Sequence, residues 1–263
     1  MDANLLIFYI FIFLFGLCIG SFLNVVIYRL EKEKKLSGRS FCPHCKHTLS
    51  WKDLVPVFSF LWLMGSCRYC SKKISWQYLV VEIATGLVFL IIFSLQYFNF
   101  TVLNLINIAF LWYIWTALIV IFVYDLKHYI IPDKILFPAI IITFSYQLVF
   151  NFSLLKHNLI WSGLGAAAFF LVIYLVSRGN WMGFGDVKLA ILLGLLLGFP
   201  NILLGMFLAF LFGAIIGLGL MIKNKKDLKS QVPFAPFLIV GTFIAMFFGQ
   251  AIIYWYMNFL ILQ

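Results

Sequence analysis

Charged residues are scarce in this chain: only 11% of its 263 residues are Asp, Glu, Lys or Arg. Acids are the scarcest, with nine against nineteen basic residues. Combined with a hydrophobic content of 64% and a mean hydropathy of +1.06, this shortage excludes an ordinary soluble domain. The apolar runs are continuous over about 20 residues rather than alternating, which favours membrane-spanning helices over a β-barrel. The sequence therefore predicts an all-α polytopic membrane protein.

The first apolar run, Leu5 to Tyr28, has no basic residue before it, where a cleaved signal peptide would carry one. We expect it to be kept as the first of about eight transmembrane helices. The others are expected at residues 77–97, 105–124, 134–150, 159–176, a short helix after Asp186, 202–222 and 233–256. Residues 151–158 are expected to form a short outer loop between two of them.

Basic residues are unevenly distributed between the two sets of loops. With the N-terminus outside, 18 of the 19 Lys and Arg residues fall on the cytosolic side, and only Lys156 falls outside. Cytosolic loops are enriched in Lys and Arg, so this bias predicts the orientation. The same rule explains the net charge of +10 without a nucleic-acid partner.

One long polar segment, residues 29–77, holds ten basic residues and two Cys-x-x-Cys pairs. The four cysteines are Cys42, Cys45, Cys67 and Cys70. Their spacing is typical of a structural tetrathiolate Zn²⁺ site. Two disulfides are disfavoured in a reducing cytosol. We expect three segments: a first transmembrane helix (1–28), a zinc-binding cytosolic loop (29–77) and a seven-helix membrane core (78–263).

Other potential ligands in or near this loop have simpler explanations. His44 and His47 flank the first cysteine pair, and we expect both to be solvated. Asp53 is expected to be an ordinary surface charge, and Cys18 a packing residue of the first helix.

Three polar residues interrupt the first two spans. Ser21 and Asn24 stand at helical spacing, and we expect them to hydrogen-bond to neighbouring helices. Glu82 lies near the cytosolic end of the second span. A membrane glutamate is either paired with a basic loop residue or part of a site, and both interpretations stay open for Glu82.

Two aspartates end apolar helices on the cytosolic side. Asp125 follows the third span, and Asp186 opens the sixth within the stretch Gly183 to Lys188. The glycines of that stretch, Gly183 and Gly185, permit sharp turns and close approach of another chain. Taken alone, Gly-x-Gly-Asp is also typical of a loop that ends in an Asp N-cap.

The shared depth of Asp125 and Asp186 predicts aspartyl protease chemistry, in which one carboxylate activates water and the other donates a proton. A proton or ion pathway is the competing interpretation. Both acids lie at one face rather than the midplane, and the chain has no inverted repeat, which favours an enzyme. Asp133, after Pro132, is expected to begin a helix, and His128 to be solvated.

These motifs, in this order, resemble the type IV prepilin peptidases over nearly the whole chain. The resemblance rests on residues 20–26, the cysteine pairs, residues 51–57, 74–78 and 80–82, Asp125 with residues 131–133, and residues 183–189.

The resemblance implies an enzyme of the bacterial inner membrane that removes the short basic leader of prepilins and pseudopilins on the cytosolic side. Asp125 and Asp186 match the catalytic aspartates. It also implies N-methylation of the new N-terminus with S-adenosylmethionine, for which Ser21, Asn24, Glu82 and the loop are the candidate residues. The basic cytosolic face is then available for anionic lipids. A peptidase without methyltransferase activity, a non-enzymatic assembly scaffold and a transporter are the alternatives.

Overall fold

The computed structural model describes residues 3–96, 101–222 and 232–261. Within these ranges the elements are helices, accompanied by two isolated antiparallel bridges in one loop, so the predicted all-α class is confirmed. The chain divides into two compact units, Met1–Val120 and Ile121–Gln263, with the boundary inside a helix. The three segments expected from the sequence follow the alternation of membrane and loop, and they stay a prediction.

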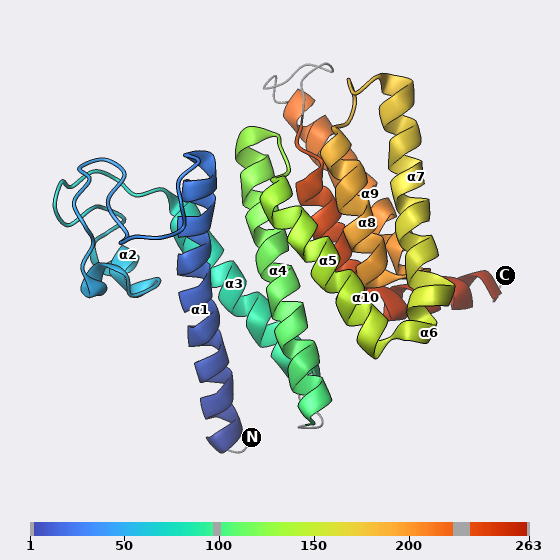
Figure 1. The fold of residues 1–263 in the computed structure, drawn as a ribbon, viewed down its shortest axis with the longest axis horizontal. Coiled ribbons are helices and arrows are strands. Elements are labelled where there is room, and N and C mark those ends of the chain that lie inside the picture. Colours follow the sequence, from blue (N-terminus) through green and yellow to red (C-terminus); the bar gives the residue numbers. More distant parts are fainter. Residues whose placement is uncertain (1–2, 97–100, 223–231, 262–263) are drawn as a thin grey trace. The chain divides into compact units, whose positions relative to one another are not determined.

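In the first unit, helices α1 (Ala3–Glu31) and α3 (Trp76–Gln96) pack closely (Figure 1). Glycines make this approach possible, because a Cβ on Gly20 would lie 2.6 Å from Cα of Glu82. One on Gly16 would lie 2.7 Å from Cα of Gly86. The polar loop between the two helices contains the single turn η1 (Trp51–Asp53) and the short helix α2 (Phe58–Trp62).

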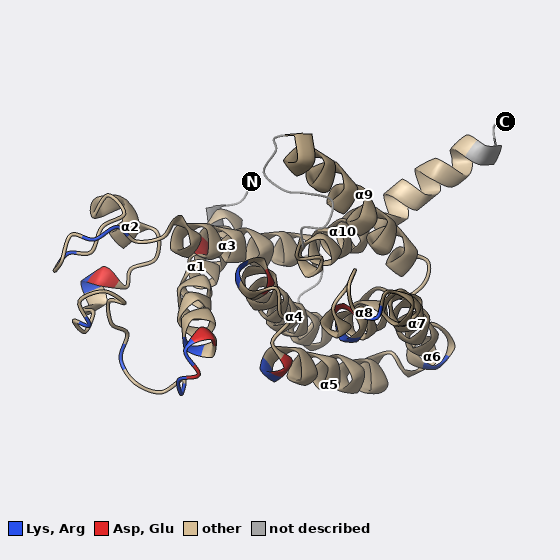
Figure 2. Ribbon diagram, turned by 90° about the horizontal axis from the view of Figure 1, so that it is seen from above, with Lys and Arg blue, Asp and Glu red and all other residues tan. Residues whose placement is uncertain are grey.

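The second unit begins in the last turns of α4 (Val102–His128) and is built around α8 (Phe184–Leu197). Helix α8 is apolar on all sides and packs against α5 (Asp133–Phe150), α7 (Ile160–Ser177), α9 (Asn201–Ile222) and α10 (Ala235–Ile261). A helix with no polar face lies either within the protein or in lipid, and most of α8 is buried within the protein. Figure 2 shows α8 among α5, α7 and α10.

One pair of glycines brings α7 and α8 together. A Cβ on Gly194 would lie 2.4 Å from Cα of Gly163, so even a methyl group at Gly194 would overlap the backbone of α7. Gly198 ends α8 with a φ of +66°. Such a left-handed residue after a helix favours glycine.

The expected set of about eight helices is present, and the one after Asp186 differs from the others in being short, as the sequence predicts. Seven described helices are long and apolar enough to cross a bilayer. Helix α8 is the remaining one, and its 14 residues extend about 21 Å, short of the roughly 30 Å hydrocarbon core. A helix this short is stable in a membrane when other helices surround it.

Two helix boundaries also differ from the prediction. Helix α4 continues for three residues beyond Asp125, so this aspartate lies inside a helix turn. The expected outer loop 151–158 is wrong: α6 (Phe152–Leu154) and the π-turn η2 (Leu155–Leu159) run directly into α7. The expected basic loop with Lys223, Lys225, Lys226 and Lys229 lies outside the described residues.

Charged residues of the described chain gather in the loop between α1 and α3 and near the ends of helices (Figure 2). This distribution is the one that a bilayer imposes, because a charge in the hydrocarbon core is costly.

Candidate active site and metal-binding loop

Asp186 is the third residue of α8, and its position is set by the start of that helix. Gly183 is the N-cap, and the backbone N–H of Asp186 donates to the Gly183 carbonyl over 3.2 Å. The Asp186 carboxylate interacts in return with the backbone N–H of Gly183. Asp186 is therefore not itself the N-cap, and its side chain is buried at 7% exposure.

Asp125 lies in the last turn of α4 and is also buried, at 5% exposure. The turn closes at Tyr129, whose N–H donates to the Asp125 carbonyl over 2.9 Å and whose φ is +58°. The Asp125 carboxylate interacts with the backbone N–H of Ala235, the first residue of α10. The positive end of a long helix dipole favours a negative charge there.

The two carboxylates are close enough to interact electrostatically with each other. Across the described residues, no Lys, Arg or His forms an ion pair with either of them. Two adjacent carboxylates without a basic partner cannot both be charged at low cost, so they can hold one proton between them. The predicted juxtaposition of Asp125 and Asp186 is thus present in the second unit.

The residues around Asp186 fix the start of α8 against the segment that follows α4. A Cβ on Gly185 would lie 3.1 Å from Cβ of Ile131, so this glycine permits close contact. Lys188 forms an ion pair with Asp133, the first residue of α5, and its ammonium group lies 5.4 Å from the centre of the Phe137 ring. The expected position of Asp133 at a helix start is confirmed.

Gly183 is different from Gly185. Its φ is −77°, which any residue adopts, and a Cβ there would meet only ordinary contacts at 3.9 Å. The sharp turn expected at this glycine is therefore absent.

In the first unit, the four loop cysteines lie together. One ligand atom from each lies within 4.8 Å of the others, and the sulfurs of Cys42 and Cys70 are 3.9 Å apart. Two thiolates of a tetrahedral zinc site, each about 2.3 Å from the metal, are separated by about 3.8 Å. The cysteines are therefore placed to share one metal ion, and the donor set fits zinc.

The two cysteine pairs are presented by the same backbone turn. The Cys42 N–H donates to His47 O and its carbonyl accepts from Lys46; Cys67 makes the same bonds to Lys72 and Ser71. A residue with positive φ closes each turn, Lys46 at +62° and Ser71 at +55°. Neither histidine joins the metal cluster: His47 stacks on Tyr69, with ring centres 3.7 Å apart.

Asp53 connects the two halves of this loop, which the sequence did not predict. Its carboxylate accepts hydrogen bonds from Ser50 (2.8 Å), Tyr69 (3.0 Å) and Arg68 (2.7 Å), the last also an ion pair. Burial alone would raise the pKa of Asp53, but the bonds from Ser50, Arg68 and Tyr69 outweigh it and lower the pKa to about 2. The interpretation of Asp53 as an ordinary surface charge is wrong.

Arg29, at the end of α1, is a second connection that the sequence did not reveal. It is only 4% exposed, and its guanidinium donates to the carbonyls of Leu36 and Gly38, among others. In the sequence, the only indication was an Arg directly after an apolar run. Such an Arg equally well indicates the orientation of the helix in the membrane.

Glu82 anchors the loop to the helix pair. Its Oε2 accepts a 2.8 Å hydrogen bond from the backbone N–H of Val57, and Ser21 also interacts with the carboxylate. Val57 has φ +62° and ψ −53°, and the Phe58 N–H bonds to Pro56 O, which makes a strained γ-turn. A β-branched residue adopts this conformation only when its surroundings impose it.

Asn24 lies on the same side of α1, 2% exposed. Its amide donates to the carbonyl of Tyr78 over 3.0 Å and accepts a long bond from Gln77. The predicted interhelical role of Asn24 is confirmed. For Glu82, one of the two interpretations left open, pairing with a basic loop residue, is not found in the described part of the chain.

Comparison with known proteins shows two family matches. Residues 14–96 match the bacterial peptidase A24 N-terminal domain, and residues 112–218 match the type IV leader peptidase family. No solved structure matches the chain.

Curated relatives match along almost the entire length. One from Aeromonas hydrophila is 31% identical, covering 95% of this chain and 94% of its own, and is named prepilin leader peptidase/N-methyltransferase. Relatives with the same name from Legionella pneumophila and Bacillus subtilis are 31% and 30% identical over 95% and 94% of this chain, and 95% and 97% of their own.

We predict that Asp53→Asn lowers the free energy of unfolding of the loop by about 1–2 kcal/mol, because the variant loses a carboxylate whose charged form is stabilised by hydrogen bonds. The partial exposure of Arg68 keeps the contribution of the ion pair modest. Amide hydrogen exchange of residues 50–54 in the full-length protein should be faster in the variant at pH 7. The folded pKa lies below the ordinary value, so the stabilisation is complete above about pH 4 and is lost as the pH falls through about 2. The difference in exchange rate between the variant and wild type should shrink as the pH falls over that range.

The control for this prediction is Glu33→Gln, another loop carboxylate for which the structure shows no hydrogen bond or ion pair. Exchange in Asp53→Asn that equals the wild-type rate at pH 7 would contradict the connecting role.

Proposed function

Because the chain belongs to the type IV leader peptidase family, we propose that it is a membrane aspartyl endopeptidase that removes the leader of type IV prepilins and pseudopilins and N-methylates the new N-terminus. The observation that carries the peptidase is the buried, mutually interacting pair Asp125 and Asp186. Neither acid has a basic partner in the described chain, as a proton-sharing pair requires.

The proposed reaction follows from one shared proton. The ionised aspartate takes a proton from water, whose oxygen attacks the scissile carbonyl carbon, while the protonated aspartate donates its proton to the carbonyl oxygen. The resulting diol collapses as the carbon–nitrogen bond breaks: one diol hydroxyl returns its proton to the aspartate that had donated one, and the leaving nitrogen takes a proton from the aspartate that had accepted one. The dyad returns to a single shared proton, and the pair titrates as a unit.

The supporting residues keep this geometry. Gly185 lets α8 approach Ile131, Lys188 ties the first turn of α8 to Asp133, and the Gly183 N–H faces the Asp186 carboxylate. Catalytic groups have to be held within a fraction of an ångström, so we assign these residues a positioning role.

The protein is a multi-pass inner-membrane protein, and we place its N-terminus outside and its two aspartates toward the cytosol. The support is the distribution of Lys and Arg, of which 18 of 19 fall on one side. The same basic face suits anionic lipid head groups. The substrates follow from the names of the relatives.

We assign the loop a structural zinc ion held by Cys42, Cys45, Cys67 and Cys70. The sulfur spacing and four thiolate donors fit zinc, and four protein ligands leave no open position for water. A loop with this little apolar core gains its fold from the metal.

We assign methyl transfer to the first unit, near Ser21, Asn24 and Glu82. S-adenosylmethionine supplies an electrophilic methyl group on a positively charged sulfur. Glu82 is a buried carboxylate held by neutral donors, with no ion pair to a described Lys or Arg, so its surroundings fit a cationic ligand. Through Val57, Glu82 also holds the metal loop beside this position.

Asp125→Asn and Asp186→Asn should each reduce prepilin cleavage by about a thousandfold or more, because one member of a proton-sharing pair is lost. Cleavage is measured with purified protein and a purified prepilin in lipid, and thermal unfolding shows that each variant is folded. Asp133→Asn is the comparison: it weakens the positioning contact with Lys188 but removes neither catalytic carboxylate, and the aspartate side of the pair is more than half exposed, so its effect should be much smaller. Near-wild-type cleavage by either dyad variant would exclude the assignment.

Elemental analysis should give about one zinc per chain, and the four cysteines should resist a thiol probe until a chelator is added. The measurement is made in a Cys18→Ser background, because Cys18 is an exposed thiol outside the cluster. Rapid labelling of all four cysteines without chelator would mean that they do not share a metal.

Two variants, Glu82→Gln and Glu82→Ala, separate the charge of this residue from its role in anchoring the loop. The amide oxygen of Gln still accepts the Val57 N–H, so this variant should keep its zinc and its peptidase activity but lose methylation at least about tenfold. Glu82→Ala should lose methylation and also free the strained turn at Val57. Mass spectrometry of the pilin N-terminus reports both reactions.

Methylation by Glu82→Gln at the wild-type rate would show that the charge of Glu82 takes no part in the reaction. Wild-type protein that cleaves without methylating would make the chain a peptidase only.

A further inference from the structure

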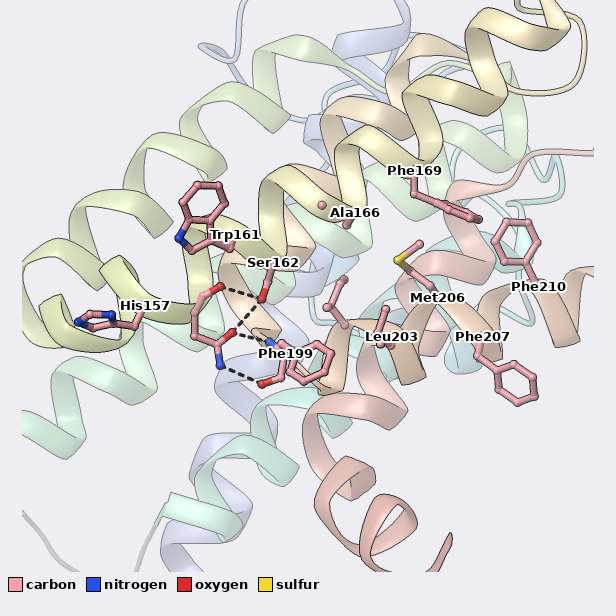
Figure 3. Close-up of a pocket in the computed structure, with 13 residues that line it drawn as sticks. His157, Trp161, Ser162, Ala166, Phe169, Phe199, Leu203, Met206, Phe207 and Phe210 are labelled. Carbon is pink, nitrogen blue, oxygen red and sulfur yellow. Dashed lines mark hydrogen bonds between the residues drawn. The ribbon is translucent and has the colours of Figure 1, made fainter. Parts of the chain in front are cut away.

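An apolar groove runs along the second unit between α7 and α9 (Figure 3). It has a volume of about 800 Å³ and extends from His157, just before α7, to Phe169 within it. The opposite wall is the first half of α9, from Ile202 to Phe210. Neither the peptidase nor the methyltransferase proposal uses it.

The groove lies toward the end of the unit opposite Asp186. Asp186 is at the start of α8, whereas Phe199, which closes one end of the groove, follows the end of α8. In the orientation proposed above, this end faces the outer leaflet.

The polar atoms of Asn158, Ser162 and the Phe199 backbone at that end bond to one another and do not face the groove as free groups. Asn158 donates to Phe199 O over 2.9 Å and accepts from the Phe199 N–H over 2.6 Å. Ser162 donates to the Asn158 carbonyl and side-chain oxygens, each over 2.8 Å, as the dashed lines in Figure 3 show. The body of the groove therefore offers hydrocarbon contact, which suits an apolar occupant.

The dimensions of the groove decide between two apolar occupants. The twelve helical steps from His157 to Phe169 extend about 18 Å, close to the roughly 15 Å thickness of one leaflet. The acyl chains of a phospholipid occupy one leaflet and match this length, whereas a membrane-spanning helix crosses both leaflets and would extend well beyond the groove.

The Phe199 end of the groove carries a positive charge in an otherwise uncharged region. Lys156 is the only charged residue between Lys134 and Arg178, and it lies beside His157. Trp161, 69% exposed, lines the groove one turn further along. A basic residue and a Trp next to an apolar surface are typical of the membrane interface.

We propose that this groove binds one phospholipid of the surrounding bilayer, with its acyl chains along α7 and α9 and its anionic head group beside Lys156 and His157. The lipid fills the space between two helices that both pack against α8. It is a site separate from the aspartates, and the lipid stabilises the unit by covering exposed apolar side chains such as Leu203 and Phe207.

Gly165 offers a direct test, because it lines the groove and a Cβ there meets no atom within 4 Å. Gly165→Phe should fill the groove without disturbing the backbone. The matched control is Gly217→Phe in α9, another helical glycine with open space around it and outside the groove. In native mass spectrometry of full-length protein released from nanodiscs, wild type and the control should retain one phospholipid, and Gly165→Phe should lose it.

The charge is tested with nanodiscs of equal parts phosphatidylglycerol and phosphatidylcholine. Wild type should retain the anionic lipid preferentially, and Lys156→Gln should reduce that preference about fivefold, the factor for about 1 kcal/mol per basic side chain.

Three outcomes would overturn the proposal. They are equal lipid retention by Gly165→Phe and wild type, no change in preference in Lys156→Gln, and a photo-crosslinker at position 165 that captures a prepilin helix or a second copy of this chain instead of lipid.

Discussion

Each buried carboxylate of the membrane helices that the structure describes faces a backbone N–H at the start of a helix, and the arrangement of the sites depends on this. Asp186 faces the N-cap of α8, Asp125 faces the first residue of α10, and Glu82 accepts from the N-cap of α2. In a bilayer, polar groups have to be satisfied within the protein, and the starts of helices supply unpaired N–H groups with a favourable dipole. A negative charge can therefore be buried without a basic partner, which leaves the carboxylate available for chemistry.

The same helix starts determine which segments meet. The first turn of α8 carries Asp186 and Lys188, and Lys188 reaches Asp133 at the start of α5. Gly185 removes the side chain that would separate α8 from Ile131. Because α8 is short and enclosed by other helices, its start is held by packing on several sides and not by a long span of its own. A site held this way suits a reaction that needs two acids at a fixed distance.

The loop of the first unit is stabilised by other interactions than the packing that holds α8. It has little apolar core, and its stability comes from four converging thiols, the bonds of Asp53 across its two halves, and Arg29 against the chain leaving α1. Glu82 then fixes the loop to the helix pair through the strained turn at Val57. Such strain persists only where the surroundings impose it, which is consistent with a functional position.

The sequence by itself determined the all-α membrane class, the convergence of four cysteines and the pairing of Asp125 with Asp186. The membrane class follows from composition, the cysteine cluster from local spacing, and the shared depth of the two aspartates from the distribution of charge along the chain. None of these requires knowing which distant segments pack together. Only the tertiary structure decided that Ala235 faces Asp125, that Asp53 bridges the cysteine pairs and that Val57 binds Glu82. Each of these contacts joins residues that packing brings together, so no local sequence pattern predicts it. The continuous helix over 152–159 was decided in the same way, because packing against neighbouring helices overrides what hydropathy predicts for a single segment.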